Sequence, residues 1–77
     1  MTGRLSGVYR GMVVSSGDPM KAGRVQVQVP VAGIQSTWAP VCVSGAAGVP
    51  SIPVGAKVVV AFEGGDPSFP VVLGRLP

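Results

Sequence analysis

The sequence predicts an all-β domain, a small barrel or sandwich built from five short strands. Its clearest strand is residues 23–29 (GRVQVQV), where valines alternate strictly with polar residues. Such alternation is typical of a strand with one buried and one polar face. Four further apolar runs are separated by turns that contain glycine and proline. Helices are not expected, because no window combines a helical period with capping residues.

The strands follow one another with short connections. Gly11 interrupts the first strand and suggests a bend or a bulge. Residues 16–22 are predicted to turn at Asp18-Pro19, residues 31–37 to form a loop, and residues 44–53 to form a second loop. Pro40 places the third strand at an edge or a bulge, because proline lacks the N–H that a central strand needs. The expected strands are residues 7–15, 23–29, 38–43, 57–62 and 71–73.

The last two strands are predicted to form an antiparallel hairpin. Residues 57–62 (KVVVAF) are β-branched and aromatic, which suits a packed strand. Glycines permit positive φ and proline fixes its own φ, so the segment that follows is predicted to turn. This structural turn consists of Gly64, Gly65, Asp66 and Pro67. The strand at 71–73 begins almost at once, as in a hairpin.

Alternation also divides residues 57–62 into two faces. The wholly apolar set is Val58, Val60 and Phe62. We expect this set to lie inside the barrel, since Lys57 marks the other set as external. Val59 and Ala61 would then be apolar residues on the outer face. We predict that they pack against a neighbouring subunit.

Size and composition favour a domain that assembles with partners. Residues 7–77 make one domain at most, and residues 1–6 are expected to be a flexible lead-in. Charged residues form 12% of the chain and apolar residues 47%, so a monomer would expose much apolar surface. No signal peptide or membrane-spanning run is expected, which predicts that the chain stays in the cytoplasm or is built into a particle there.

No catalytic chemistry is predicted. The chain has no histidine, one cysteine and three scattered acids, so neither a nucleophile with its base nor a metal site is expected. Cys42 is expected to be a small buried residue. Glu63 and Asp66 are expected to cap the backbone of the turn. We therefore expect no enzyme activity, no cofactor and no small-molecule substrate.

Single-stranded nucleic-acid binding is the alternative function. It needs aromatic platforms beside a basic groove. The bases here are spread singly along a chain of net charge +3, and Phe62 is assigned to the core and Phe69 to packing in the turn. Tyr9 and Trp38 remain, as candidates for a subunit interface or for base stacking. Two platforms are a weak basis, so nucleic acid is not expected as a ligand.

Several stretches together resemble a known family. The segment PVGAKVVVAFEGGDPSFPVVLG at 53–74 is similar to the end of the OB-fold domain of phage baseplate and tail-spike proteins, the group of baseplate assembly protein V and the Vgr-type spikes of type VI secretion. The other matching stretches are YRGMVV at 9–14, DP at 18–19, GRVQV at 23–27 and WA at 38–39. In order and spacing they cover about residues 8–75.

The resemblance sharpens both the fold and the function. Strand number alone leaves an OB-fold and an SH3-like barrel open; the resemblance implies the five-stranded Greek-key OB-fold. It also implies a structural, homotrimeric collar or adaptor that joins the tail hub to the central spike in the virion, assembled in the host cytoplasm. Larger relatives carry a lytic module or a needle after this domain, so those roles, and any membrane contact, are expected of another chain.

Overall fold

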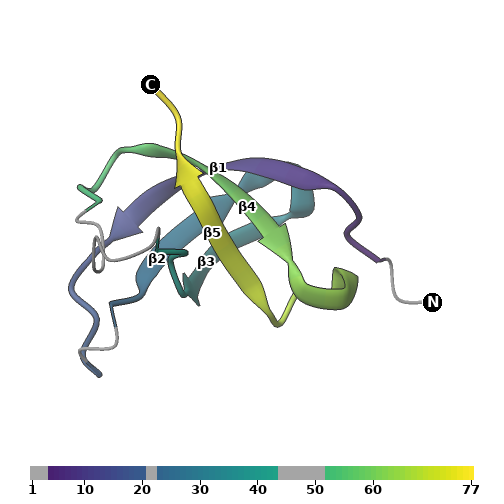
Figure 1. Ribbon diagram of the computed structural model, residues 1–77, viewed down its shortest axis with the longest axis horizontal. Coiled ribbons are helices and arrows are strands. Elements are labelled where there is room, and N and C mark those ends of the chain that lie inside the picture. The colour runs from purple at the N-terminus through teal and green to yellow at the C-terminus, as the bar shows by residue number, and fades with distance from the viewer. Residues whose placement is uncertain (1–3, 21–22, 44–51) are drawn as a thin grey trace.

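The computed structural model describes residues 4–20, 23–43 and 52–77, and its five antiparallel strands form a single sheet (Figure 1). The strand order in the sheet is β3-β2-β1-β4-β5. The described residues contain two short 3₁₀ helices and no α-helix. The elements in chain order are β1 (Val8–Ser15), β2 (Val25–Val29), η1 (Pro30–Ala32), β3 (Ile34–Ala39), β4 (Lys57–Phe62), η3 (Glu63–Gly65) and β5 (Pro70–Arg75).

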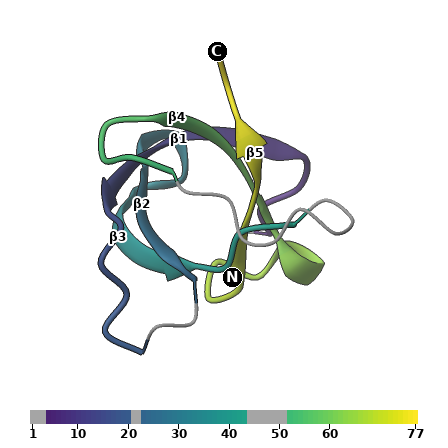
Figure 2. The ribbon, with the colours of Figure 1, turned by 60° about the vertical axis from the view of Figure 1, so that its left-hand side comes forward.

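The sheet curves around its core, so that the chain after β3 meets β5 (Figure 2). Val41 and Val72 form a parallel bridge. The N–H of Cys42 donates to the carbonyl of Val72 at 2.9 Å, and the N–H of Val72 donates to the carbonyl of Pro40 at 2.9 Å. These two bonds pair the backbone of Val72 on the side of β5 that faces away from β4.

The core consists of inward-facing residues from all five strands, most of them valine. The predicted alternation of β2 and β4 is confirmed: Val58 and Val60 are fully buried, while Val59 and Ala61 are half-buried and Lys57 is exposed. Branched side chains fill this space in fixed rotamers, which favours a well-packed small sheet. The buried apolar residues are Val13, Val25, Val27, Val29, Ala39, Ile52, Ala56, Val58, Val60, Phe62 and Val72.

Gly11 is needed for close packing and not for a bulge. A Cβ at this position would lie 2.8 Å from the carbonyl oxygen of Gln28 on β2. The irregularity in β1 lies between Val13 and Ser15, two residues further along. The expectation of a bulge at Gly11 was therefore wrong, and the reason for a glycine there is the approach of the neighbouring strand.

The third strand was also misplaced by the sequence. β3 begins at Ile34, so residues 34–37 belong to a strand and not to the expected loop. The loop is limited to η1 and Gly33, whose φ of 72° ends that turn. Gln35 and Ser36 carry no apolar signal because β3 is at the edge of the sheet and exposes them. Most of the expected loop at 44–53 lies outside the described residues.

Candidate assembly surface

The outer face of β1, β4 and β5 carries a row of apolar residues across three strands. Val8 lies opposite Ala61, and Ala61 lies opposite Val71. Side chains at directly opposed positions share a face and lie within contact distance. Val8 is 61% exposed, and its two neighbours in the row are half-buried. The row is thus apolar surface that the isolated chain leaves open to water.

Further apolar residues extend this row into a strip. Val59 lies two residues before Ala61 on β4 and so on the same face. Met12 on β1 is 42% exposed. Leu73 on β5 is 46% exposed, at a register shift opposite Val59 and Val60. Contiguous exposed apolar surface is the usual mark of an interaction site. We call Val8, Met12, Val59, Ala61, Val71 and Leu73 the outer strip.

The sequence had identified only part of this strip. Val59 and Ala61 were predicted to lie on the outer face, and they do. The exposure of the other four depends on which residues they oppose across the sheet, so the sequence missed Val8, Met12, Val71 and Leu73. The alternation of β5 about the buried Val72 was the signal that could have found two of them.

Two unneutralised bases lie at one end of the outer strip. Arg10 is opposite Val59 and Lys57 is opposite Met12, so the two bases are diagonal neighbours on adjacent strands. Both are exposed, and neither forms an ion pair within residues 4–20, 23–43 and 52–77. Like charges in this position repel weakly, and an acidic partner would relieve the repulsion.

The β4–β5 turn lies at the other end of the strip and is fixed by backbone contacts. Gly64 and Gly65 have φ of 61° and 76°, in the region that glycine adopts without strain. The carboxylate of Asp66 accepts the N–H of Ser68 at 2.9 Å, as expected for an acid that caps the turn. Glu63 and Asp66 are both exposed.

Phe69 does not pack in the turn as the sequence suggested. Its side chain is 58% exposed, although its N–H donates to the carbonyl of Asp66 at 3.0 Å. The backbone bonds of the turn close it without help from the ring. An exposed aromatic side chain therefore lies in the same turn as two exposed acids.

The residues before β1 lie against the same turn. The N–H of Leu5 donates to the carbonyl of Gly65 at 2.9 Å, and Arg4 Nη1 donates to the carbonyl of Gly64 at 2.7 Å. Leu5 is partly buried and packs on the core. These contacts attach residues 4 and 5 of the expected lead-in to the domain.

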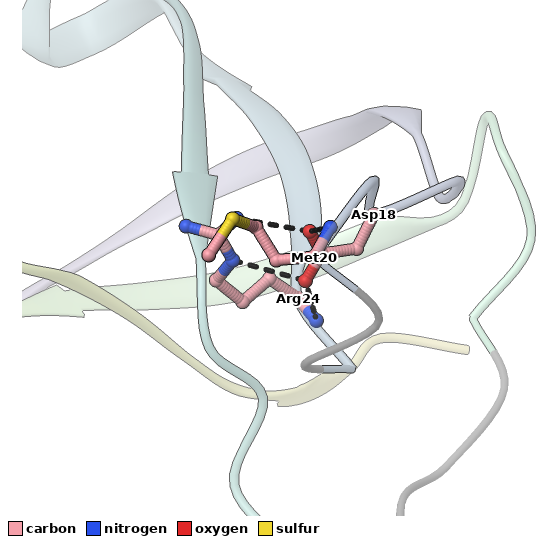
Figure 3. A network of polar contacts seen from close by, with 3 residues as sticks. All are labelled: Asp18, Met20 and Arg24. Atoms are coloured by element: carbon pink, nitrogen blue, oxygen red, sulfur yellow. Dashed lines mark hydrogen bonds and ion pairs between the residues drawn. The ribbon is translucent and has the colours of Figure 1, made fainter.

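Away from the outer strip, Asp18 fixes the connection between β1 and β2 by hydrogen bonds within that connection (Figure 3). Its carboxylate accepts the backbone N–H groups of Met20 and Arg24 and two N–H groups of the Arg24 guanidinium, at 2.9–3.2 Å. The Asp18 side chain is 3% exposed. The hydrogen bond and the charge of Asp18 raise the pKa of Arg24 above its ordinary value, so the guanidinium stays charged.

Tyr9 and Trp38, the two candidate aromatic platforms, do not form a base-stacking site together. The Arg24 guanidinium lies 5.4 Å from the centre of the Trp38 ring, so one of the ring's partners is already an arginine of this chain. Tyr9 packs edge-to-face on Phe62, with ring centres 5.6 Å apart, on the inner side of the sheet. The interface roles predicted for Tyr9 and Trp38 remain predictions, but their rings occupy opposite faces.

The remaining candidate chemistry is sparse. Cys42 is exposed, so the expectation that it is buried was wrong; it follows the edge strand β3 and points away from the core. In the described part of the chain, no three acids or cysteines gather closely enough to bind a metal ion. Nor does that part contain a helix long and apolar enough to cross a bilayer.

Comparison with known families agrees with this architecture. Residues 9–76 match the model of the type VI secretion system and phage-baseplate injector OB domain. This match covers nearly the whole chain, from β1 to the residue after β5. The chain belongs to the phage-baseplate injector OB-domain family. No curated protein sequence matches it significantly.

Family membership confirms the resemblance seen in the sequence and fits the five-stranded antiparallel sheet. It supports a structural role in a phage baseplate or type VI injector, as a tail component that assembles with other tail proteins. It also suggests a protein that is not an enzyme.

Proposed function

We propose that this injector OB domain is a homotrimeric collar that joins the tail hub to the central spike of the particle. The family match gives the baseplate context. The outer strip is the observation that carries the assembly role, because a structural module needs a surface to bind its neighbours and the strip is an exposed apolar surface that runs across three adjacent strands.

A threefold assembly would cover this surface without changing the domain. Each subunit would place the strip against its neighbour, and the ring would present three equivalent copies of one end to the hub and of the other end to the spike. A domain of 77 residues has a small core, so burial of the strip would also stabilise it. Assembly would take place in the host cytoplasm, and the finished collar would remain in the virion.

The test is the composition of purified particles that contain this chain. Quantitative mass spectrometry of purified tails should find three copies per tail, and chemical cross-linking should connect them to the hub and spike proteins. A chain absent from the particles, or present at hundreds of copies as a tube or sheath protein would be, contradicts the proposal.

A further inference from the structure

The charges of the described residues are distributed unevenly between the two ends of the β4–β5 hairpin. Asp18 forms an ion pair with Arg24, which leaves Glu63 and Asp66, both in the turn, as the other acids of the chain. Arg10 and Lys57 lie at the far end of the outer strip. Lys57 is the first residue of β4, and η3 follows the last; Figure 1 shows the coiled turn at the end of the β4 arrow, away from the start of that strand.

These acids and bases are too far apart to neutralise one another within one subunit. From Lys57 to Glu63 the chain runs the length of β4, which is about 20 Å at 3.3 Å per residue. This distance is about two and a half Debye lengths at physiological ionic strength. Both charged groups are therefore available to a partner, and each is the complement of the other.

We infer that the β4–β5 turn of one subunit docks on the basic end of the outer strip of the next copy of the chain. Glu63 and Asp66 of the first subunit then face Arg10 and Lys57 of the second. The contact is heterologous, since it joins two different surfaces, and it closes into a ring when the rotation is a third of a turn. The threefold closure rests on the proposed function; the pairing of the two surfaces does not.

The apolar groups of the two surfaces also match. Phe69 is 58% exposed in the turn, and Met12 and Leu73 are 42% and 46% exposed on the strip. A docked aromatic ring surrounded by charge pairs is the usual composition of an interface centre and its rim. Arg4 binds the carbonyl of Gly64, so two acids and one base give the turn a net charge of −1.

A second copy fits this surface better than an anionic polymer does. Two bases on an apolar strip lack the stacked aromatic rings that hold single-stranded nucleic acid. A typical stable interface buries about 800 Å² on each partner. That is about a sixth of the chain's surface of 4908 Å², so a subunit can take part in two such contacts.

Charge reversal tests the pairing directly. In the base-reversed variant, Arg10→Glu with Lys57→Glu makes both ends acidic. In the acid-reversed variant, Glu63→Lys with Asp66→Asn makes the turn basic, and asparagine keeps the hydrogen bond to the N–H of Ser68. The dissociation constant of the oligomer, measured by analytical ultracentrifugation at 0.15 M salt, should be at least tenfold higher for each variant than for the wild type. The combination of all four substitutions should restore assembly.

The matched control changes the net charge away from the outer strip, at one position in η1 and one in β3. Val31→Glu with Gln35→Glu lowers the net charge by two at exposed positions around β3, as Lys57→Glu alone does on the strip. The control should assemble like the wild type, while Lys57→Glu should not. Circular dichroism should show the same fold for all of these variants, because every altered side chain is exposed.

Mixing the base-reversed and acid-reversed variants distinguishes a ring of three from a twofold pair. A two-subunit particle can pair every charge, whereas a closed ring of three must contain one like-charged contact. We therefore expect incomplete rescue in the mixture and full rescue in the combined variant. Trimers that persist in both reversed variants, no rescue in the combined variant, or a wild-type monomer at 200 µM would each overturn the inference. Complete rescue in the mixture would keep the pairing and contradict the threefold closure of the proposed function. Persistent trimers would be compatible with the proposed function. Absence of the chain from purified particles would contradict the proposed function but not the pairing of the two surfaces.

Discussion

Replacing Val60 by aspartate tests the division of β4 into an inner and an outer face. Val60 is fully buried and lies opposite Tyr9 on one side and Val72 on the other. Among the described residues no charged or polar side chain is buried in this core, so the new carboxylate would find no partner there. Val59→Asp is the matched control, since it places the same group one residue away on the outer face.

The expected cost of Val60→Asp follows from two terms. Holding the carboxyl neutral at pH 7, when its pKa in the unfolded chain is about 3.9, costs about 4 kcal/mol. Losing the burial of a valine costs a further 1.5–3 kcal/mol, roughly. A domain of this size has a free energy of unfolding of about 4–12 kcal/mol. The summed cost of about 5.5–7 kcal/mol lies inside this range, so the variant should lose about half or more of its free energy of unfolding at pH 7.

The pH dependence adds a second readout. Burial raises the pKa of the introduced carboxyl in the folded state above its unfolded value, so the native state binds the proton more tightly. The destabilisation is then full above the folded pKa and fades as the pH falls toward about 4. Circular dichroism melts of Val60→Asp at pH 7 and pH 4 should show recovery of structure at the lower pH, relative to the wild type measured at the same two values.

Val59→Asp should behave differently in both assays. The new acid lies opposite Arg10, and a cross-strand pair of opposite charges contributes about 0.2–1 kcal/mol, which offsets the poor strand propensity of aspartate. The fold should persist, while light scattering should show weaker assembly. A Val60→Asp variant with the same free energy of unfolding as the wild type at pH 7 would refute the assignment of faces, and normal assembly of Val59→Asp would refute the role of the outer strip.

Three further predictions concern other parts of the domain. Gly11→Ala should lower the free energy of unfolding by about 1–3 kcal/mol in urea titrations, because its Cβ meets the carbonyl of Gln28; Gly74→Ala, which meets nothing within 4 Å, should have little effect, and equal effects would contradict the packing argument. Asp18→Asn should cost about 1.5–3 kcal/mol through its lost bonds to Arg24, and an unchanged melt would disprove that role. Fluorescent single-stranded oligonucleotides should show no submicromolar binding at 0.15 M salt, and tight binding would favour the alternative function.

The sequence predicted the elements whose patterns are local. The alternation of β2 and β4 is visible in the residues themselves, because burial on one face requires a period of two. The turn between β4 and β5 was predictable for a similar reason, since Gly64 and Gly65 permit positive φ and Pro67 fixes its own φ. Local chemistry decides these features, and distant contacts only refine them.

The errors occurred where a distant strand decides the outcome. The start of β3 was missed because an edge strand exposes polar residues that resemble a loop. Gly11 was assigned to a bulge because the approach of Gln28 cannot be seen in one strand alone. The exposure of Cys42 and Phe69 likewise depends on which backbone groups pair across the sheet.

The β2–β3 part and the β1–β4–β5 part of the sheet's outer face differ in how many of their polar groups are already hydrogen-bonded or ion-paired. This difference supports assembly on one part and not the other. On the β2–β3 side, Asp18 binds Arg24, Arg24 covers Trp38, and Gln26 donates to Ser36. A partner on that side would have to break contacts that already exist, at a cost in desolvation and lost hydrogen bonds. On the β1–β4–β5 side the described bases form no ion pair and the apolar side chains are open to water. Binding there would add contacts without breaking any of these hydrogen bonds, which supports the proposed assembly of subunits on this face.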